Sequence, residues 1–335
     1  MAQEIIFDCE VVTPMFLGGA DQQAELRASA IKGAMRWWFR AMMGDEDMSK
    51  LKESESEVFG SSDRGRSTFS IRNSTRMSPI KSALPRHEAE VAGKRFKINI
   101  LDYLAYGPAA FEKGRGIVLK RDYLPPHGEF DLKLAFRDPK HLNAILKAML
   151  MLVRFGGLGA RSRNGYGSIH IIASVPSVAE MGVDPQLDLS RLAATKDEIP
   201  TFSAFSKHIK LFQARTVHST WDKALAEIGL AYRESRLELE RRHFFDKRQY
   251  IGAPIYEGKV RKSRLERRAK PYFLNVRKLS NGFRGQILFL PSAYCCGLDK
   301  DADGKAISHT QVNSDFLKSC AEINSNLSKK LNEVL

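Results

Sequence analysis

The chain changes between a strand period and a helix period in a repeated order, and this alternation limits its possible folds more than any other feature. Residues 4–12 (EIIFDCEVV) are rich in β-branched and aromatic residues and stop at a Thr-Pro turn, which predicts a strand. Apolar residues then recur at helical spacing from Ile31 to Met42, which predicts an amphipathic helix that begins at Ser29 and ends near Gly44. The chain therefore opens with a strand followed by a helix.

The same change of period occurs a second time. Residues 129–136 (EFDLKLAF) alternate with period two, residues 138–155 carry helix signals at both ends, and residues 168–175 (SIHIIASV) are strongly β-branched. Extra strands are predicted between these units, at residues 66–72, 96–106 and 117–123. This order predicts an α+β fold of the ferredoxin-like class, in which helices cover one face of an antiparallel sheet.

The second half of the chain repeats the pattern in a weaker form. Residues 177–200 mix Pro, Ser, Asp and Ala without a lasting period, which predicts a linker between a domain of residues 1–176 and a domain of residues 201–335. The second domain is predicted to contain a strand at 209–217, a helix at 221–239, strands at 272–276 and 286–290, and a helix at 315–335. We interpret it as a degenerate repeat of the first ferredoxin-like (RRM-like) domain.

The charge balance favours a polyanionic partner. The chain has 335 residues, a net charge of +14 and a pI near 9.6, and its hydrophobic fraction of 43% excludes a disordered protein. Residues 233–284 alone hold 16 Lys and Arg against 6 Asp and Glu. A basic surface that serves only solubility, or a solvated basic arm, is the alternative interpretation.

The sequence gives no sign of secretion, membrane insertion or metal binding. The N-terminus is acidic where a signal peptide would be basic, and no apolar run reaches the length of about 18 residues that a membrane span requires. The four cysteines, Cys9, Cys295, Cys296 and Cys320, lack C-x-x-C spacing. We therefore expect a cytoplasmic protein with reduced thiols and no structural zinc.

Three cations stack on one face of the predicted first helix. Lys32, Arg36 and Arg40 lie at i, i+4 and i+8, and no acidic residue occurs between Arg27 and Arg40. Like charges at this spacing oppose helix formation, so an anion such as phosphate is expected against them. Alternatively, these side chains reach solvent along the apolar face or pair with acids of residues 45–57, a segment predicted to be a solvated loop.

Trp37 lies beside this stripe of cations. Its side chain is predicted either to stack on a nucleic-acid base or to cover neighbouring arginine stems, whereas Trp38 is predicted to be in the core.

A glycine-rich loop, GGLGARSRNGYG at residues 156–167, is the second candidate binding feature. It leaves a helix and enters a strand, the reverse of a dinucleotide-binding loop, and it lacks a Gly-Lys-Ser/Thr ending, so no nucleotide cofactor is expected. Its main-chain N–H groups could instead form an anion-binding nest, next to the side chains of Arg161, Arg163 and Asn164. A helix C-cap followed by a turn is the alternative. The glycines concerned are Gly156, Gly157, Gly159, Gly165 and Gly167.

No catalytic constellation emerges from the sequence. The eight histidines are scattered without H-x-x-x-H spacing, and no carboxylate pairs have two-metal spacing. A metal-free ribonuclease could still assemble from distant residues, with His127 or His87 as candidates.

Three segments resemble the RAMP proteins of CRISPR systems. They are FLGGADQQAELRASAIKGAMRWWFRAM from Phe16, VFGSSDRGRSTFSI from Val58 and GGLGARSRNGYGSI from Gly156. The pattern R-x-S-x-I-K-G-x-x-R-W-W-x-R at residues 27–40 is similar to the first RAMP subunit family of the type III-B Cmr effector, and the similarity returns at residues 267–291. This sequence departs from the pattern at Ala28 and Ala30, near the start of the helix, where the pattern often has proline.

The resemblance implies a function without catalysis. It implies two ferredoxin-like domains, a glycine-rich loop at the RNA surface, and a capping position that holds the 3′ region of the guide RNA and helps capture target RNA among other RAMP subunits. It implies no catalytic residue, since target cleavage belongs to another subunit.

Two alternatives remain open, an endoribonuclease that trims precursor guide RNA and a protein-only scaffold with acidic partners. We expect the cations of the helix and of the glycine loop to meet along one groove. The predicted RNA-binding residues are Arg27, Lys32, Arg36, Trp37, Arg40, Arg161, Arg163, Asn164, Arg267, Arg268 and Lys270.

Overall fold

The computed structural model describes residues 3–19, 23–44, 47–90, 97–193, 198–241, 244–252, 256–257, 260–261, 263, 265, 268–294, 300–301 and 304–335. In this part of the chain, no helix combines the length and the apolar character needed to cross a membrane.

The first half forms a four-stranded antiparallel sheet in the order β2-β7-β1-β8. Apolar side chains alternate along its strands, so that Phe7 of β1 and Leu132 of β7 are fully buried on the face that two helices cover. The order along the chain is the βαββαβ order of a ferredoxin-like unit: β1 (Gln3–Val11), α1 (Ala28–Met43), β2 (Phe69–Thr75), β7 (Glu129–Phe136), α4 (Leu142–Phe155) and β8 (Ile169–Val175).

The second half contains a sheet of the same type, in the order β12-β13-β9-β14 and again antiparallel throughout. Its elements follow the same βαββαβ order: β9 (Lys210–Gln213), α6 (Trp221–Leu237), β12 (Tyr272–Leu279), β13 (Gly282–Phe289), α7 (His309–Lys330) and β14 (Asn332–Glu333). The prediction of an α+β fold with two ferredoxin-like sheets is therefore confirmed.

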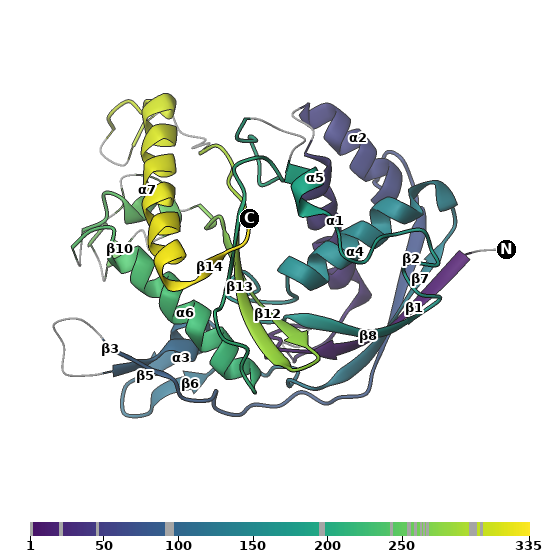
Figure 1. Ribbon diagram of the computed structural model, residues 1–335, viewed down its shortest axis with the longest axis horizontal. Helices are drawn as coiled ribbons and strands as arrows, with labels where there is room; N and C mark the ends of the chain where they lie inside the picture. Colours follow the sequence, from purple (N-terminus) through teal and green to yellow (C-terminus); the bar gives the residue numbers. More distant parts are fainter. Residues whose placement is uncertain are drawn as a thin grey trace.

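The two halves pack through the second sheet, whose two faces are both covered (Figure 1). Leu274 and Val276 belong to the core shared with α6 and α7, while Phe273 points the other way, into the core of the first half. There its ring lies 5.1 Å from the ring of Trp37 on α1. The sheet is thus a layer between two pairs of helices, and the segments that join the halves surround it.

Residues 45–57 do not form the predicted solvated loop, because α2 (Met48–Phe59) occupies most of them. Asp47 caps this helix by accepting hydrogen bonds from the N–H groups of Ser49 and Lys50, at 2.9 and 3.2 Å. Leu51, Val58 and Phe59 supply a buried face, and Glu53 and Glu57 are exposed on the helix surface.

Three other local predictions are wrong. The predicted helix at 315–335 ends at Lys330, and Asn332–Glu333 form strand β14. Residues 96–106 are not one strand, because the Asn99 side chain accepts a hydrogen bond from Leu101 N and begins helix α3 (Ile100–Leu104) directly after β4 (Lys97–Asn99). Ser29 does not cap α1, whose N-cap position is Arg27.

The remaining short elements decorate the two sheets and their connections. They are β3 (Glu88–Glu90), β5 (Ala109–Glu112), β6 (Gly116–Leu119), η1 (Pro139–His141), α5 (Leu189–Ala193), η2 (Arg248–Ile251), β10 (Tyr256–Glu257) and β11 (Val260–Arg261).

The segment predicted to be a linker is packed against the first half. Val178, Val183 and Leu187 are buried in its core, and the short helix α5 lies in the same segment. Apolar contacts therefore hold much of the connection in place.

Candidate nucleic-acid interface

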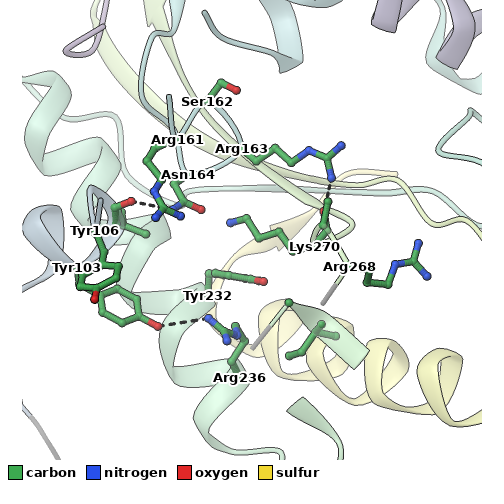
Figure 2. A pocket seen from close by; sticks show the side chains of 14 residues that line it. Tyr103, Tyr106, Arg161, Ser162, Arg163, Asn164, Tyr232, Arg236, Arg268 and Lys270 are labelled. Atoms are coloured by element: carbon green, nitrogen blue, oxygen red, sulfur yellow. Dashed lines mark hydrogen bonds between the residues drawn. The ribbon is translucent and has the colours of Figure 1, made fainter. Parts of the chain in front are cut away.

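A cavity of about 680 Å³ lies between the two halves of the molecule (Figure 2). The glycine-rich loop and α3 form one side, and α6, η2 and the segment before β12 form the other. No Asp or Glu is among its described lining residues: Tyr103, Leu104, Tyr106, Arg161, Ser162, Arg163, Asn164, Tyr232, Arg236, Ile251, Gly252, Arg268, Ala269 and Lys270. This one cavity unites five cationic side chains with three tyrosines.

The glycines of the loop are required by contacts within the protein. Gly159, Gly165 and Gly167 have φ angles of +85°, +89° and +70°, which L side chains rarely adopt. A Cβ on Gly167 would lie 1.9 Å from the carbonyl oxygen of Leu158, and one on Gly159 would lie 2.3 Å from that of Phe16. A Cβ on Gly156 or Gly157 would also lie too close to its neighbours, with the nearest atoms at 2.5 and 2.6 Å. The loop therefore has the alternative structure named above, a helix end followed by a compact turn.

The tip of the loop joins the two halves by hydrogen bonds. The N–H of Leu274 donates to the carbonyl of Arg163 at 3.1 Å, and the Arg163 guanidinium donates to the carbonyl of Lys270 at 2.8 Å. Asn164 Nδ2 donates to the carbonyl of Leu104 at 2.7 Å. Arg161 has a φ of +62°, unusual for a residue with a side chain, and its side chain points along the cavity wall toward Tyr106.

Lys270 is the most deeply placed cation of the cavity. Its Nζ atom has no solvent contact and no hydrogen-bond partner in the part of the chain that the structure describes, and it lies 4.3 Å from the centre of the Tyr232 ring. Burial, followed by the charges of Arg236, Arg163 and Arg161, holds the pKa of Lys270 well below its ordinary value. An anion in the cavity would supply a negative counter-charge for the protonated Lys270 side chain.

Arg163 and Arg268 pack against aromatic rings in the wall of the cavity. The Arg163 guanidinium lies 4.5 Å from the Phe273 ring centre and 5.5 Å from that of Trp37, and burial together with Arg268 lowers its pKa to about 10. Arg268 donates to Ser292 Oγ at 2.6 Å and lies 4.5 Å from the Phe316 ring centre.

The cations of the first helix lie elsewhere, so the expectation of a single groove is wrong. None of Arg27, Lys32, Arg36 or Arg40 lines the cavity. Glu55 of α2 accepts from Arg36 Nε at 3.2 Å and from Arg40 Nη1 at 2.9 Å, with only 15% of its side chain exposed.

The other two cations of this helix region also contact the protein. The Lys32 amine lies 5.1 Å from the Phe69 ring centre, and Arg27 donates to the carbonyl of Gly18 at 3.0 Å. The alternative interpretation, pairing with acids of residues 45–57, therefore describes Arg36 and Arg40. Any RNA contact of the helix stays a prediction.

Trp37 is packed within the protein. Its ring lies 4.8 Å from that of Trp38 and 5.1 Å from that of Phe273, and the Arg163 guanidinium covers it. Trp38 is buried, as predicted. Arg267, another predicted RNA-binding residue, lies outside the described residues.

The two candidate histidines each contact a carboxylate. His127 Nδ1 lies 2.9 Å from Glu10 Oε1, and its side chain is 61% exposed. His87 Nε2 lies 2.6 Å from Asp222 Oδ2. Lys278 donates to the other oxygen of Glu10. No group of three or more His, Cys, Asp or Glu side chains that could hold a metal ion occurs among the described residues.

Sequence reasoning missed the aromatic part of the cavity. Tyr103 and Tyr106 lie in a segment predicted to be a strand, and Tyr232 and Arg236 lie one turn apart on a helix that was predicted without any binding role. The spacing of the last pair, tyrosine and arginine at i and i+4 on α6, was the available signal.

Comparison with known proteins agrees with this fold. Residues 8–170 match the RAMP superfamily. The CRISPR system Cmr subunit Cmr1-2 of Pyrococcus furiosus is 30% identical over 180 residues, which are 50% of this chain and 95% of that protein. Subunit Cmr1-1 of the same organism is 29% identical over 290 residues, 79% of this chain and 80% of that protein.

Two solved structures share the fold across almost the whole chain. The crystal structure of apo Cmr1 from Pyrococcus furiosus has a TM-score of 0.61 at 23% identity, covering 99% of this chain and 98% of that chain. A chain of the type III-B Cmr-beta complex bound to cognate target RNA has a TM-score of 0.50 at 13% identity, covering 96% and 100%. The chain therefore belongs to the RAMP superfamily and, within it, to the family of the Cmr subunit Cmr1.

Proposed function

We propose that this chain is an RNA-binding, non-catalytic subunit of a cytoplasmic type III-B CRISPR effector, and that it contacts RNA at the cavity between its two halves. The observation that carries the proposal is the lining of this cavity: Arg161, Arg163, Arg236, Arg268 and Lys270 lie together with no acidic side chain among the described lining residues. Such a group favours a polyanion, and the net charge of +14 has the same sign.

The relatives supply the biological setting of the proposal. They are Cmr subunits, and one solved relative is part of a complex that holds cognate target RNA. In this setting the subunit would cap the assembly, hold the 3′ region of the guide RNA, help capture target RNA in antiviral defence, and contact other RAMP subunits. It would need no cofactor.

The test compares two double variants of the full-length protein. Arg161→Ala/Arg236→Ala removes two cations of the cavity, and Arg36→Ala/Arg40→Ala removes two cations that share an ion pair with Glu55. Guide-RNA affinity is measured against salt concentration. Each phosphate contact contributes about 0.7 to 0.9 to the slope of log affinity against log salt, so the cavity variant should lose about 1.4 to 1.8.

The helix variant is expected to keep the wild-type slope. A loss confined to the helix variant would move the RNA contact to α1, and a wild-type slope near zero would exclude RNA binding by the isolated protein.

The second candidate function is that of a metal-independent endoribonuclease. The observation that favours it is the position of His127. This histidine is exposed, and Glu10, a buried carboxylate, orients its ring. Purified protein is incubated with repeat RNA in EDTA. Cleavage that His127→Ala abolishes and His87→Ala preserves would establish the enzyme, and intact RNA in all samples would exclude it.

A further inference from the structure

Three side chains of the cavity each carry one buried polar atom that lacks a hydrogen-bond partner within the described residues. These atoms are Lys270 Nζ, Tyr232 Oη and Arg236 Nε. Buried polar groups are nearly always paired in folded proteins, because an unmade hydrogen bond costs free energy. Three such atoms at one cavity indicate that a ligand completes the site.

The chemistry of these atoms selects the ligand. The arginine Nε is a donor only, and so is the lysine amine in its protonated form, while burial raises the pKa of the Tyr232 hydroxyl, which keeps its proton available. The matching ligand must therefore be rich in acceptors and negatively charged. In Figure 2, the side chains of Lys270 and Tyr232 are directed into the same space, with Arg236 below them and Arg161 across from them.

Two tyrosines stand near these donors. Tyr103 and Tyr106 are 39% and 68% exposed, and Arg236 Nη1 donates to the Tyr103 hydroxyl at 3.3 Å. Exposed aromatic rings beside a cationic site provide a surface on which a nucleic-acid base can stack. The cavity thus has a polar, buried part and an aromatic, accessible part.

We propose that this cavity binds the terminal phosphate monoester of a nucleotide, with the phosphate on Lys270, Tyr232 and Arg236 and the base against Tyr106. The proposal rests on the function proposed above in that the natural ligand is an RNA end. A monoester carries up to two negative charges and three free oxygens, whereas an internal diester carries one charge and is flanked by chain on both sides. The number of donors and cations favours the monoester.

Binding of this group should be coupled to uptake of a proton. The cations and hydroxyls that face Lys270 are Arg161 and Arg163 of the loop, Tyr232 and Arg236 of α6, Tyr103 of α3, and Arg268 of its own segment. These surroundings disfavour the ammonium form while the cavity lacks an anion, and a phosphate dianion would reverse that preference.

The first test uses the full chain and free ligands. Inorganic phosphate and adenosine monophosphate are titrated by calorimetry at several pH values between neutral pH and the ordinary lysine pKa, each in two buffers of different ionisation enthalpy. Wild-type protein should bind the nucleotide with uptake of a proton, and Lys270→Met should weaken binding about tenfold or more and abolish the uptake.

Lys32→Met is the matched control, because Lys32 is also a partly buried lysine whose pKa is lowered by burial, and it lies outside the cavity. Equal binding by wild type and Lys270→Met, or no binding by either, would overturn the proposal.

The second test separates this site from general RNA binding. Oligoribonucleotides of one sequence are compared with a 3′-phosphate, with a 5′-phosphate, and with hydroxyls at both ends. One phosphate-bearing end should bind about tenfold more tightly than the hydroxyl form, and Lys270→Met should remove this preference. If all three bind alike with a steep salt dependence, the RNA function stands and the terminal-phosphate site fails.

Discussion

The α1 stripe (Lys32, Arg36 and Arg40) and the cavity between the halves are both rich in cations, yet only one contains an internal counter-charge. Glu55 lies against Arg36 and Arg40 of the stripe, whereas the described lining of the cavity contains no carboxylate. The difference teaches that a run of basic residues does not by itself identify a binding surface. What distinguishes the two regions is the supply of counter-charge from elsewhere in the chain.

The largest effect on stability is expected in the glycine-rich loop, which carries Arg161 and Arg163 of the cavity. Gly167→Ala places a Cβ 1.9 Å from a carbonyl oxygen at a φ of +70°, so the free energy of unfolding should fall by more than about 3 kcal/mol. Chemical denaturation measures it.

Gly65→Ala is the control near the helix stripe, with a φ of +82° and open space around the new atom. It should cost only about 1 to 2 kcal/mol. Equal losses for the two variants would show that tight packing does not hold the cavity loop.

The next effect concerns Glu10, where a buried carboxylate meets Lys278 and His127. Burial would raise its pKa, but the hydrogen bonds from Lys278 and His127 outweigh burial and lower it below 4.5. The unfolded state then binds more protons in this window, so the stabilisation is present above pH 4.5 and is lost as pH falls through the folded-state pKa.

Glu10→Gln should lower the free energy of unfolding at pH 7 by about 2 kcal/mol. The variant should also lose less stability than the wild type as the pH falls below 4.5. Stability measured from pH 3 to 7 tests it, and an unchanged pH profile would contradict the ion pair.

Removal of one cation from each region should change the free energy of unfolding in opposite directions. Lys270→Met removes a buried amine without a partner among the described residues, and should raise the free energy of unfolding by about 1 to 2 kcal/mol at pH 7. Because the folded-state pKa of Lys270 is lowered, stability rises with pH up to the ordinary value, so the gain should shrink toward pH 10.5.

Arg40→Met breaks the pair with Glu55 and should instead cost about 1 kcal/mol. Both variants are measured by denaturation at pH 7 and pH 10. A lower free energy of unfolding in both would contradict the proposed difference between the cavity and the α1 stripe.

The smallest effect is predicted for Glu55→Gln, which converts the stripe into unpaired cations. Stability should fall by only about 0.5 to 1 kcal/mol, because the charge of Glu55 is lost while the glutamine side-chain oxygen can still accept a hydrogen bond from an arginine. Affinity for any RNA at low salt should rise, with a steeper salt dependence. Unchanged RNA affinity would mean that Glu55 does not screen the stripe.

Local patterns predicted most of the fold. The period-two alternation at residues 129–136 coincides with β7, and the apolar spacing in residues 138–155 corresponds to the short helix η1 followed by α4. Two of the errors fell where short-range capping decided the outcome: Asp47 and Asn99 each begin a helix in segments without strong apolar periodicity. Such a cap acts over three residues, a range at which average composition carries little information.

The site was predictable only in part. Arg161, Arg163, Asn164, Arg268 and Lys270 were recognised as candidates, and the structure brings all five to one cavity. The glycines were recognised too, but their contacts are with the protein's own carbonyl oxygens and side chains. A sequence shows that glycine is required at a position and does not show which atom approaches it.

By itself, the sequence determined the βαββαβ order in the first half and all but the last strand of that order in the second, because strand and helix periods are local properties of the chain. Tertiary structure alone decided which charged side chains come together. Glu55 lies 15 to 19 positions beyond the two arginines it contacts, and Lys270 and Arg161 come from different halves of the chain. Charge pairing depends on distance in space, and that distance is fixed only when the two sheets and their helices pack together.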